Sequence, residues 1–206
     1  MASVPQYNPN RYGAYKSSYW RNPNVSSTYE PGSIFKPIVA AAALQAGTAK
    51  PNDIFFCENG SYRIGNTKIG EAANHKFGWL TLAGIIEKSS NIGAIKIARQ
   101  LGQKRLFEYV KKFGFGEKAG VDLPGESRGQ LQELKNWSAL SGPSISFGHE
   151  IGVTPIQMIT AISAIANGGN LMHPHITRKI IRNGVVTREF QPVVVNRAIS
   201  AKVSRQ

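Results

Sequence analysis

Ser-Ile-Phe-Lys-Pro-Ile-Val-Ala-Ala-Ala-Ala-Leu-Gln-Ala-Gly, residues 33–47, is typical of a helix that the rest of the chain must cover. Pro37 suits the first helical turn, where its missing N–H breaks no bond, and Gly47 suits the position just past a helix end. The side chains are apolar nearly all round, which is the composition of a buried helix. The stretch therefore predicts a central helix.

Apolar residues keep a helix-compatible spacing in four other segments, residues 80–86, 92–101, 106–113 and 154–166. The last segment has the clearest ends, because Thr154-Pro155 supplies an N-cap with a proline at the first helical position, and Gly168-Gly169 follows. Phe107, Tyr109 and Phe113 lie at helical spacing and are expected in the core. The run from Phe113 to Gly116 is interpreted as a helix stop, not as a phosphate-binding loop.

Strand signals are local. Residues 61–69 predict a short hairpin around Gly65-Asn66, and residues 176–181 and 185–190 flank Asn183-Gly184, a dipeptide that accepts the positive φ angles of a tight turn. Residues 1–32 predict an extended loop laid over the rest, and residues 114–151 an irregular stretch. Without repeats or composition breaks, we expect one domain of the α+β class, α-rich with a minor antiparallel sheet.

The composition narrows the class of protein. Of the 206 residues 41% are hydrophobic and 18% charged, so a globular core is expected. We find no apolar run of transmembrane length and no secretory signal in the chain as written. Cys57 is the only cysteine, which rules out an intrachain disulfide and favours buried packing. The net charge of +13 leaves nucleic acid, an anionic membrane surface and an acidic polymer open as partners.

Ser33 and Lys36 are the first candidates for chemistry. A spacing of three residues places the hydroxyl and the amine on one helix face, where the amine can take the hydroxyl proton if its pKa is lowered. The N–H groups of a first helical turn have no partner within the helix, so the Ser33 N–H can donate to an oxyanion.

Ser89-Ser90-Asn91 adds a Ser-x-Asn triplet downstream of this pair. Each motif occurs about once by chance in a chain of this composition, so their order and context carry the weight. Penicillin-binding proteins and β-lactamases combine Ser-x-x-Lys, Ser-x-Asn and Lys-Thr-Gly in that order, and the third motif is absent from these residues.

Several longer stretches resemble class B penicillin-binding proteins, particularly their division and sporulation members. They are Tyr-Glu-Pro-Gly-Ser-Ile-Phe-Lys-Pro at 29–37, Lys-Ser-Ser-Asn-Ile-Gly at 88–93, Phe-Gly-Phe-Gly at 113–116, Gly-Val-Asp-Leu-Pro-Gly-Glu at 120–126, Phe-Gly at 147–148 and Val-Thr-Pro at 153–155. The resemblance extends from Ser3 to about Gly169. It implies the penicillin-binding transpeptidase fold, which is shared with serine β-lactamases.

The resemblance also implies roles and partners. Ser33 would be the acylated nucleophile, Lys36 its general base, Ser89 a proton relay and Asn91 a donor to the bound peptide. The reaction would be peptidoglycan D,D-transpeptidation between stem peptides ending in D-Ala-D-Ala, blocked by β-lactams, without metal or cofactor. A membrane glycan polymerase and division proteins are the implied partners, and the extracytoplasmic face of the bacterial cell membrane is the implied location.

The chain departs from the family pattern at its ends, so we expect a partial transpeptidase domain over residues 1–206, truncated before the Lys-Thr-Gly strand. Within it we expect an extended loop and strand remnant at 1–32, a helical region with the motifs at 33–169, and a hairpin with the start of a last helix at 170–206. Loss of one oxyanion donor lowers rates by roughly 10²–10³, so an impaired enzyme is expected.

Other interpretations stay open. The chain could be a non-catalytic fragment, a basic polymer-binding remnant, or a D,D-carboxypeptidase or β-lactamase-like hydrolase. No nucleic-acid recognition motif accompanies the charge, so no specific nucleic acid is expected. His173-Pro174-His175 has no nearby third ligand and predicts a loop, not a metal site. His149-Glu150 resembles a base with an orienting acid, but structural packing is favoured.

Overall fold

The computed structural model describes residues 2–206. The helices are α1 (Pro23–Ser26), α2 (Lys36–Gln45), α3 (Leu82–Lys88), α4 (Asn91–Leu101), α5 (Gln103–Lys112), α6 (Ser141–Ser146), α7 (Pro155–Ala166) and α8 (Ala201–Ser204). The strands are β1 (Ile54–Phe56), β2 (Ser61–Ile64), β3 (Thr67–Gly70), β4 (Trp79–Thr81), β5 (Asn170–Met172), β6 (Lys179–Arg182), β7 (Val185–Glu189) and β8 (Val194–Arg197). Over residues 2–206, no helix has the length and apolarity needed to cross a membrane.

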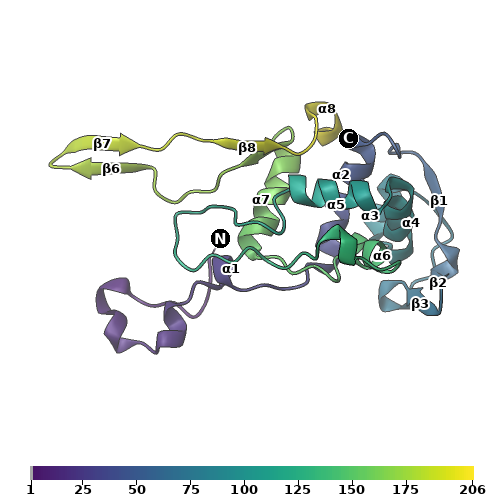
Figure 1. The fold of residues 1–206 in the computed structure, drawn as a ribbon, viewed down its shortest axis with the longest axis horizontal. Coiled ribbons are helices and arrows are strands. Elements are labelled where there is room, and N and C mark those ends of the chain that lie inside the picture. Colours follow the sequence, from purple (N-terminus) through teal and green to yellow (C-terminus); the bar gives the residue numbers. More distant parts are fainter. Residues whose placement is uncertain (1) are drawn as a thin grey trace.

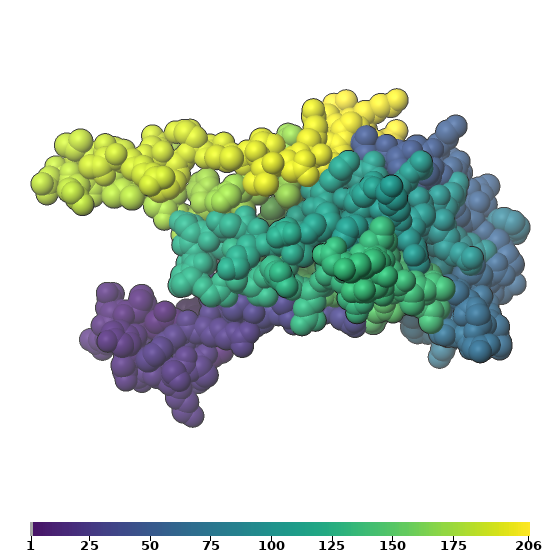
Figure 2. Space-filling model, viewed as in Figure 1, coloured from purple at the N-terminus to yellow at the C-terminus, as the bar shows by residue number. Residues whose placement is uncertain are grey.

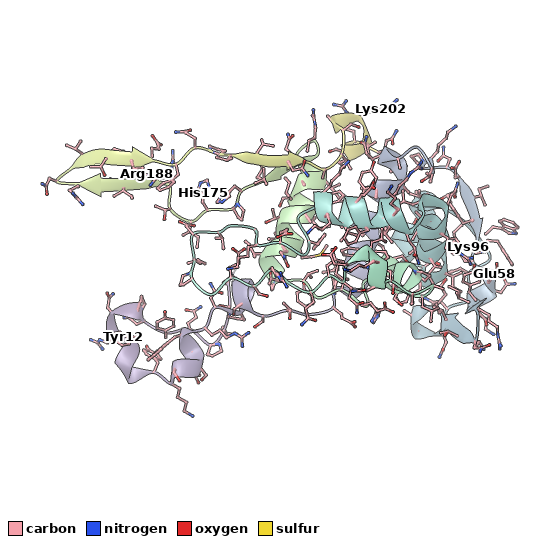
Figure 3. All side chains as sticks on the ribbon, viewed as in Figure 1. Tyr12, Glu58, Lys96, His175, Arg188 and Lys202 are labelled. Carbon is pink, nitrogen blue, oxygen red and sulfur yellow. The ribbon has the colours of Figure 1, made fainter. Side chains whose placement is uncertain are left out.

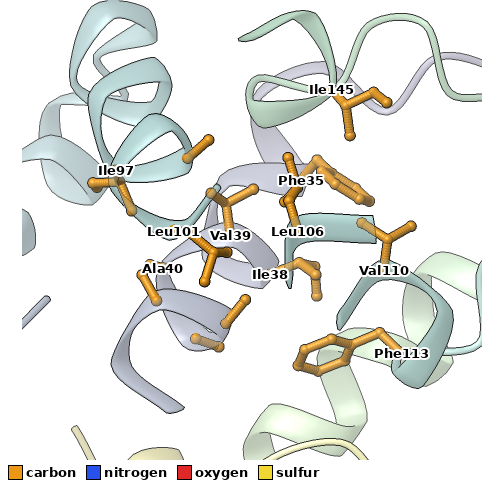
Figure 4. Close-up of a cluster of buried hydrophobic side chains, with 14 of the residues drawn as sticks. Phe35, Ile38, Val39, Ala40, Ile97, Leu101, Leu106, Val110, Phe113 and Ile145 are labelled. Carbon is orange, nitrogen blue, oxygen red and sulfur yellow. The ribbon is translucent and has the colours of Figure 1, made fainter. Parts of the chain in front are cut away.

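Helix α2 is the centre of the molecule, as the sequence predicts. Lys36 and residues 38–43 of α2 are buried, and α3, α4, α5, α7 and α8 all pack against it. Figure 4 shows part of this core, where α2 side chains such as Ile38 meet Leu101 of α4 and Leu106 of α5. Burial of each such aliphatic side chain contributes about 1.5–3 kcal/mol, so this cluster is the main source of stability.

The helix ends that the sequence predicts are found with the expected conformations. Gly47, just after α2, has a φ of +67°. Thr154 caps α7: its hydroxyl accepts from the Gln157 N–H while the Gln157 side chain accepts from the Thr154 N–H, a capping box. Gly168 and Gly169 follow α7 with φ of +89° and +95°. These positive angles favour glycine because they carry a steric penalty for other residues.

Helix α5 buries a different face from the expected one. Phe113 is 1% exposed, but Phe107 and Tyr109 are only half-buried, and Leu106 and Val110 occupy the core instead. Phe107 packs edge-on against Trp137 with ring centroids 5.7 Å apart. The prediction of three core aromatics is therefore right for Phe113, partly right for Tyr109, which packs against the core from its edge, and wrong for Phe107. Gly114 follows with a φ of +87°, so the predicted helix stop is confirmed.

The strands of residues 2–206 form four separate two-stranded antiparallel sheets: β1 with β4, β2 with β3, β5 with β8, and β6 with β7. Both predicted hairpins are present. The β2–β3 hairpin turns at Gly65-Asn66, and the β6–β7 hairpin turns at Asn183-Gly184 with φ of 51° and 78°. The expected α+β architecture with minor antiparallel sheet is thus observed.

Some segment boundaries differ from the predictions. Leu80 and Thr81 belong to β4, where Leu80 pairs with Phe55, and α3 starts only at Leu82 because Thr81 is its N-cap. Residues 176–178 precede β6 and are not in it. The short helix α6 lies inside the stretch expected to be irregular, and its Gly142-Pro143 explains why no helical signal was visible.

Two segments project from the helical body (Figures 1 and 2). One is the N-terminal segment before α1; it contains two short 3₁₀ helices, Pro9–Ala14 and Ser17–Trp20. It packs on itself, with Trp20 edge-on to Tyr12 at 5.6 Å, so the expectation of an extended loop laid over the rest is wrong for this part of residues 1–32. Near Tyr29, which pairs with Val153 of the body, the chain is extended as expected. The other is the β6–β7 hairpin. Tyr12 and Arg188 mark the two projections in Figure 3.

Candidate active site

Ser33 and Lys36 meet at the start of the central helix. Ser33 lies in a 3₁₀ turn, Gly32–Phe35, that leads directly into α2, whose first residue is Lys36. The Lys36 Nζ lies 3.1 Å from the Ser33 Oγ. Ser33 is exposed, whereas Lys36 is 2% exposed and packed beneath it. The hydroxyl therefore faces solvent while the amine that can take its proton is shielded from it.

Ser89 and Asn91 reach the same amine from the turn between α3 and α4. The Lys36 Nζ lies 3.0 Å from the Ser89 Oγ, 2.5 Å from the Ser89 carbonyl oxygen and 2.8 Å from the Asn91 Oδ1. The four residues predicted from sequence are thus gathered around one nitrogen, although 53 residues separate Lys36 from Ser89. Their individual roles remain predictions. The Asn91 Nδ2 donates to the Gly70 carbonyl at 3.1 Å, so one of its two hydrogens is already engaged.

Burial changes the proton affinity of Lys36. Desolvation lowers its pKa from 10.5 to about 8, and the negative charge of Glu71 opposes this shift. An ordinary lysine is almost fully charged at neutral pH and cannot accept a proton. A lysine with a pKa of about 8 is neutral often enough to act as a base near physiological pH.

The turn that carries Ser33 is held by a distant segment. The Gly32 N–H donates to the Gly148 carbonyl at 3.0 Å, and Tyr29 forms a two-bond antiparallel bridge with Val153. Glu30 accepts from the His149 Nδ1 at 2.8 Å and from the Glu150 N–H at 2.9 Å. His149 is exposed and its acid partner is Glu30, so His149 and Glu150 form no base–acid pair. They tether the serine turn.

A groove of about 660 Å³ adjoins this tether, between residues 28–30 and α5. Its lining includes Glu30, Gln130 and Ile151, but not Ser33 or Lys36. The nucleophile candidate therefore lies at the surface beside the groove.

Glu71 is a site residue that the sequence did not reveal. It is 8% exposed, and its carboxylate accepts hydrogen bonds from the Ser90 Oγ and the Asn91 N–H, both at 2.5 Å. Ser90 follows it by 19 residues, across a hairpin end and a helix, so no local spacing connects them. The sequence shows only a single acidic residue in this segment, and nothing in it indicates that the carboxylate is buried and hydrogen-bonded.

The other candidates lie elsewhere. Cys57 is fully buried, as predicted, and burial raises the pKa of its thiol. His173 and His175 lie in the segment joining β5 to β6, and within residues 2–206 no three His, Cys, Asp or Glu side chains gather as a metal-ligand set.

The family model of the penicillin-binding protein transpeptidase domain matches residues 1–206. The chain belongs to the penicillin-binding protein transpeptidase family. It is 34% identical, over an alignment of 209 residues, to stage V sporulation protein D of Bacillus subtilis, covering 100% of this chain and 32% of that protein. It is 33% identical to peptidoglycan D,D-transpeptidase FtsI of Escherichia coli, covering 82% of this chain and 28% of that protein.

A solved structure confirms the transpeptidase fold expected from the resemblance. Penicillin-binding protein 3 of Mycobacterium tuberculosis, complexed with aztreonam, superposes with a TM-score of 0.83 at 31% identity, over 97% of this chain and 44% of that one. The chain thus spans about a third of the length of these curated relatives, and the match is to the transpeptidase part.

Proposed function

We propose that this chain carries the acylation centre of a peptidoglycan D,D-transpeptidase that cross-links stem peptides through an acyl-serine intermediate. Membership of the transpeptidase family and relatives named as D,D-transpeptidases support this class of reaction. The observation that carries the proposal is the contact between an exposed Ser33 hydroxyl and a buried Lys36 amine whose pKa lies at about 8.

The geometry supports a simple sequence of proton transfers. Neutral Lys36 accepts the proton of the Ser33 Oγ as that oxygen attacks the carbonyl carbon of the D-Ala-D-Ala bond. The Ser33 N–H, which lies in the first turn, can donate to the resulting oxyanion. The proton then passes from the Lys36 Nζ through the Ser89 Oγ, 3.0 Å away, to the nitrogen of the departing D-alanine. An ester between Ser33 and the peptide remains.

In the second half of the reaction, the proton transfers run in the opposite direction. An amine of another stem peptide attacks the ester carbonyl and loses its proton to Lys36 through Ser89. The Ser33 oxygen departs and recovers a proton from Lys36, which leaves a new peptide bond and the starting enzyme. No oxidant, metal or nucleotide takes part in these steps.

β-Lactams are proposed to acylate the same hydroxyl. Related structures of the M. tuberculosis protein carry aztreonam and ampicillin, which supports this class of ligand for the family. The resemblance to class B penicillin-binding proteins leads us to place the reaction at the outer face of the cell membrane, with a glycan polymerase and division or sporulation proteins as partners. The name of the Bacillus subtilis relative, stage V sporulation protein D, supports a link to sporulation.

A labelling experiment tests the proposal. We expect a fluorescent penicillin to form a covalent adduct with the folded chain, and digestion with mass spectrometry to locate it on Ser33. The Ser33→Ala variant should lose the label, while Ser18→Ala, an exposed serine in a 3₁₀ turn of the N-terminal segment, should keep it. A folded wild-type chain that takes no label, or a label that persists in Ser33→Ala, would contradict the proposal.

A further inference from the structure

Glu71 binds two consecutive residues of the Ser89–Asn91 turn with its two carboxylate oxygens. Oε1 accepts from the Ser90 Oγ and Oε2 accepts from the Asn91 N–H, each at 2.5 Å. Ser90 is fully buried and Glu71 nearly so. Burial of a charged carboxylate is costly unless its oxygens accept hydrogen bonds. These two bonds therefore stabilise the charged form of Glu71 at this position.

The same contacts stabilise the start of α4. Asn91 is the first residue of this helix, and its N–H is one of the groups without a partner inside the helix. The Ser90 Oγ, while donating to Glu71, accepts from the Gly93 N–H at 2.9 Å. A carboxylate in this position also interacts favourably with the helix dipole.

The turn needs this support because of its backbone. Ser89 has φ of 55° and ψ of 42°, the left-handed region that non-glycine residues adopt at an energetic cost. In that conformation both its carbonyl oxygen and its hydroxyl point at the Lys36 Nζ. The Gly70 carbonyl, next to Glu71, accepts from the Asn91 Nδ2 and so turns the Asn91 Oδ1 toward the same nitrogen.

We propose that Glu71 is a positioning residue for the acylation reaction: it holds Ser89 and Asn91 against Lys36 and places a negative charge near the Lys36 ammonium. The proposal rests on the proposed function for the assignment of Lys36 as base. It assigns to Glu71 no contact with substrate.

The effect of the Glu71 charge on the pKa of Lys36 can be separated from that of the other charged groups near this cluster. From the β1–β2 side come Cys57, a buried thiol, and Glu58, which pairs with Lys96 of α4 at 2.5 Å (Figure 3). From α3 come Glu87 and Lys88, an exposed pair at 2.8 Å. Each pair has no net charge. Glu71 is the one charge that opposes the effect of burial on Lys36 in the described part of the chain.

Removal of that charge should lower the pKa of Lys36 further below its present value. Three variants test this. Glu71→Gln removes the charge, Glu71→Asp keeps the charge on a shorter side chain, and Glu126→Gln is the matched control. Glu126 also accepts from backbone N–H groups, those of Ala119 and Gly120. Two quantities are measured: the titration midpoint of Lys36, by NMR of labelled lysine, and the rate of Ser33 acylation by penicillin.

For Glu71→Gln we expect the Lys36 midpoint to fall by about half a pH unit or more. We also expect the limiting acylation rate to fall about tenfold, since an amide cannot accept both hydrogen bonds. Glu71→Asp should keep the wild-type midpoint with a rate several-fold below wild type, and Glu126→Gln should change neither quantity.

An unchanged Lys36 midpoint in folded Glu71→Gln would overturn the proposal. That result is what a residue with a purely structural role would give, since its loss would not alter the Lys36 titration. If Glu71→Gln does not fold, Glu71→Asp decides, and a wild-type acylation rate in that variant overturns it. A wild-type chain that is never acylated would contradict the proposed function. The effect of Glu71 on Lys36 could still be tested in that case, because the NMR titration requires no reaction.

Discussion

At the scale of single residues, Gly148 supports the turn that carries Ser33. Its φ is +83°, and a Cβ added to it would lie 2.1 Å from the Gly32 carbonyl oxygen and 2.4 Å from the Gly32 nitrogen. Gly32 immediately precedes Ser33 and donates its N–H to the Gly148 carbonyl. The two backbones therefore approach as closely as they do only because Gly148 has no side chain.

We expect Gly148→Ala to lower the free energy of unfolding by about 2–4 kcal/mol, because it combines an unfavourable φ with a clash against backbone. Penicillin labelling of Ser33 should fall as well. Gly184→Ala is the matched control: its φ is +78° but nothing lies within 4 Å of the added Cβ, so only about 1 kcal/mol should be lost. Urea titration measures both, and equal losses in the two variants would show that the contact with Gly32 has no effect.

At the scale of elements, the β6–β7 hairpin projects from the helical body (Figure 1). Every residue of both strands is exposed, including Ile180, Ile181, Val185 and Val186. Its base is already closed, since the Phe190 N–H donates to the Arg178 carbonyl at 2.8 Å. The preceding residues are tied to the body by Asp122, which accepts from the N–H groups of Ile176 and Thr177. Hydrogen bonding by the Thr177 side chain, together with these two backbone bonds, holds the pKa of Asp122 well below its usual value.

Replacement of residues 179–189 by a short Gly-Ser linker should therefore leave the unfolding temperature within about 2 °C of wild type. Ser33 labelling should be retained, and solubility should increase because exposed apolar strand surface is removed. Calorimetry and the penicillin label measure these effects. A fall of more than about 5 °C would show that the hairpin contributes to the core.

Elements also show how far the sequence could predict this fold. Helices with explicit ends, such as α2 before Gly47 and α7 after Thr154-Pro155, were predictable because their caps are local. The three-residue strands β1 and β4 were not, since such short strands show no alternation and are defined by the partner with which they pair. The hairpins were predictable because their tight turns require positive φ angles, which the Gly and Asn residues at these turns accept.

At the scale of the whole molecule, the site is assembled from four distant segments. The 3₁₀ turn and first turn of α2 supply Ser33 and Lys36, the α3–α4 turn supplies Ser89 and Asn91, Glu71 follows β3, and the segment around Gly148 supports the serine turn. The sequence motifs identified Ser33, Lys36, Ser89 and Asn91, the four residues to which we assign the proposed chemistry. They did not identify Glu71, because it acts through tertiary contacts that leave no periodic pattern, and they marked Gly148 only as part of a resembling stretch, without its contact with Gly32.

The pH dependence of Ser33 acylation by penicillin tests the central claim most directly. Lys36 must be neutral to accept the Ser33 proton, and its pKa of about 8 means that it is charged below that pH. The acylation rate of the wild-type chain should therefore rise with pH through a single midpoint near 8 and then level off. A rate that is independent of pH over this range, or that falls as Lys36 loses its proton, would contradict the assignment of Lys36 as the base.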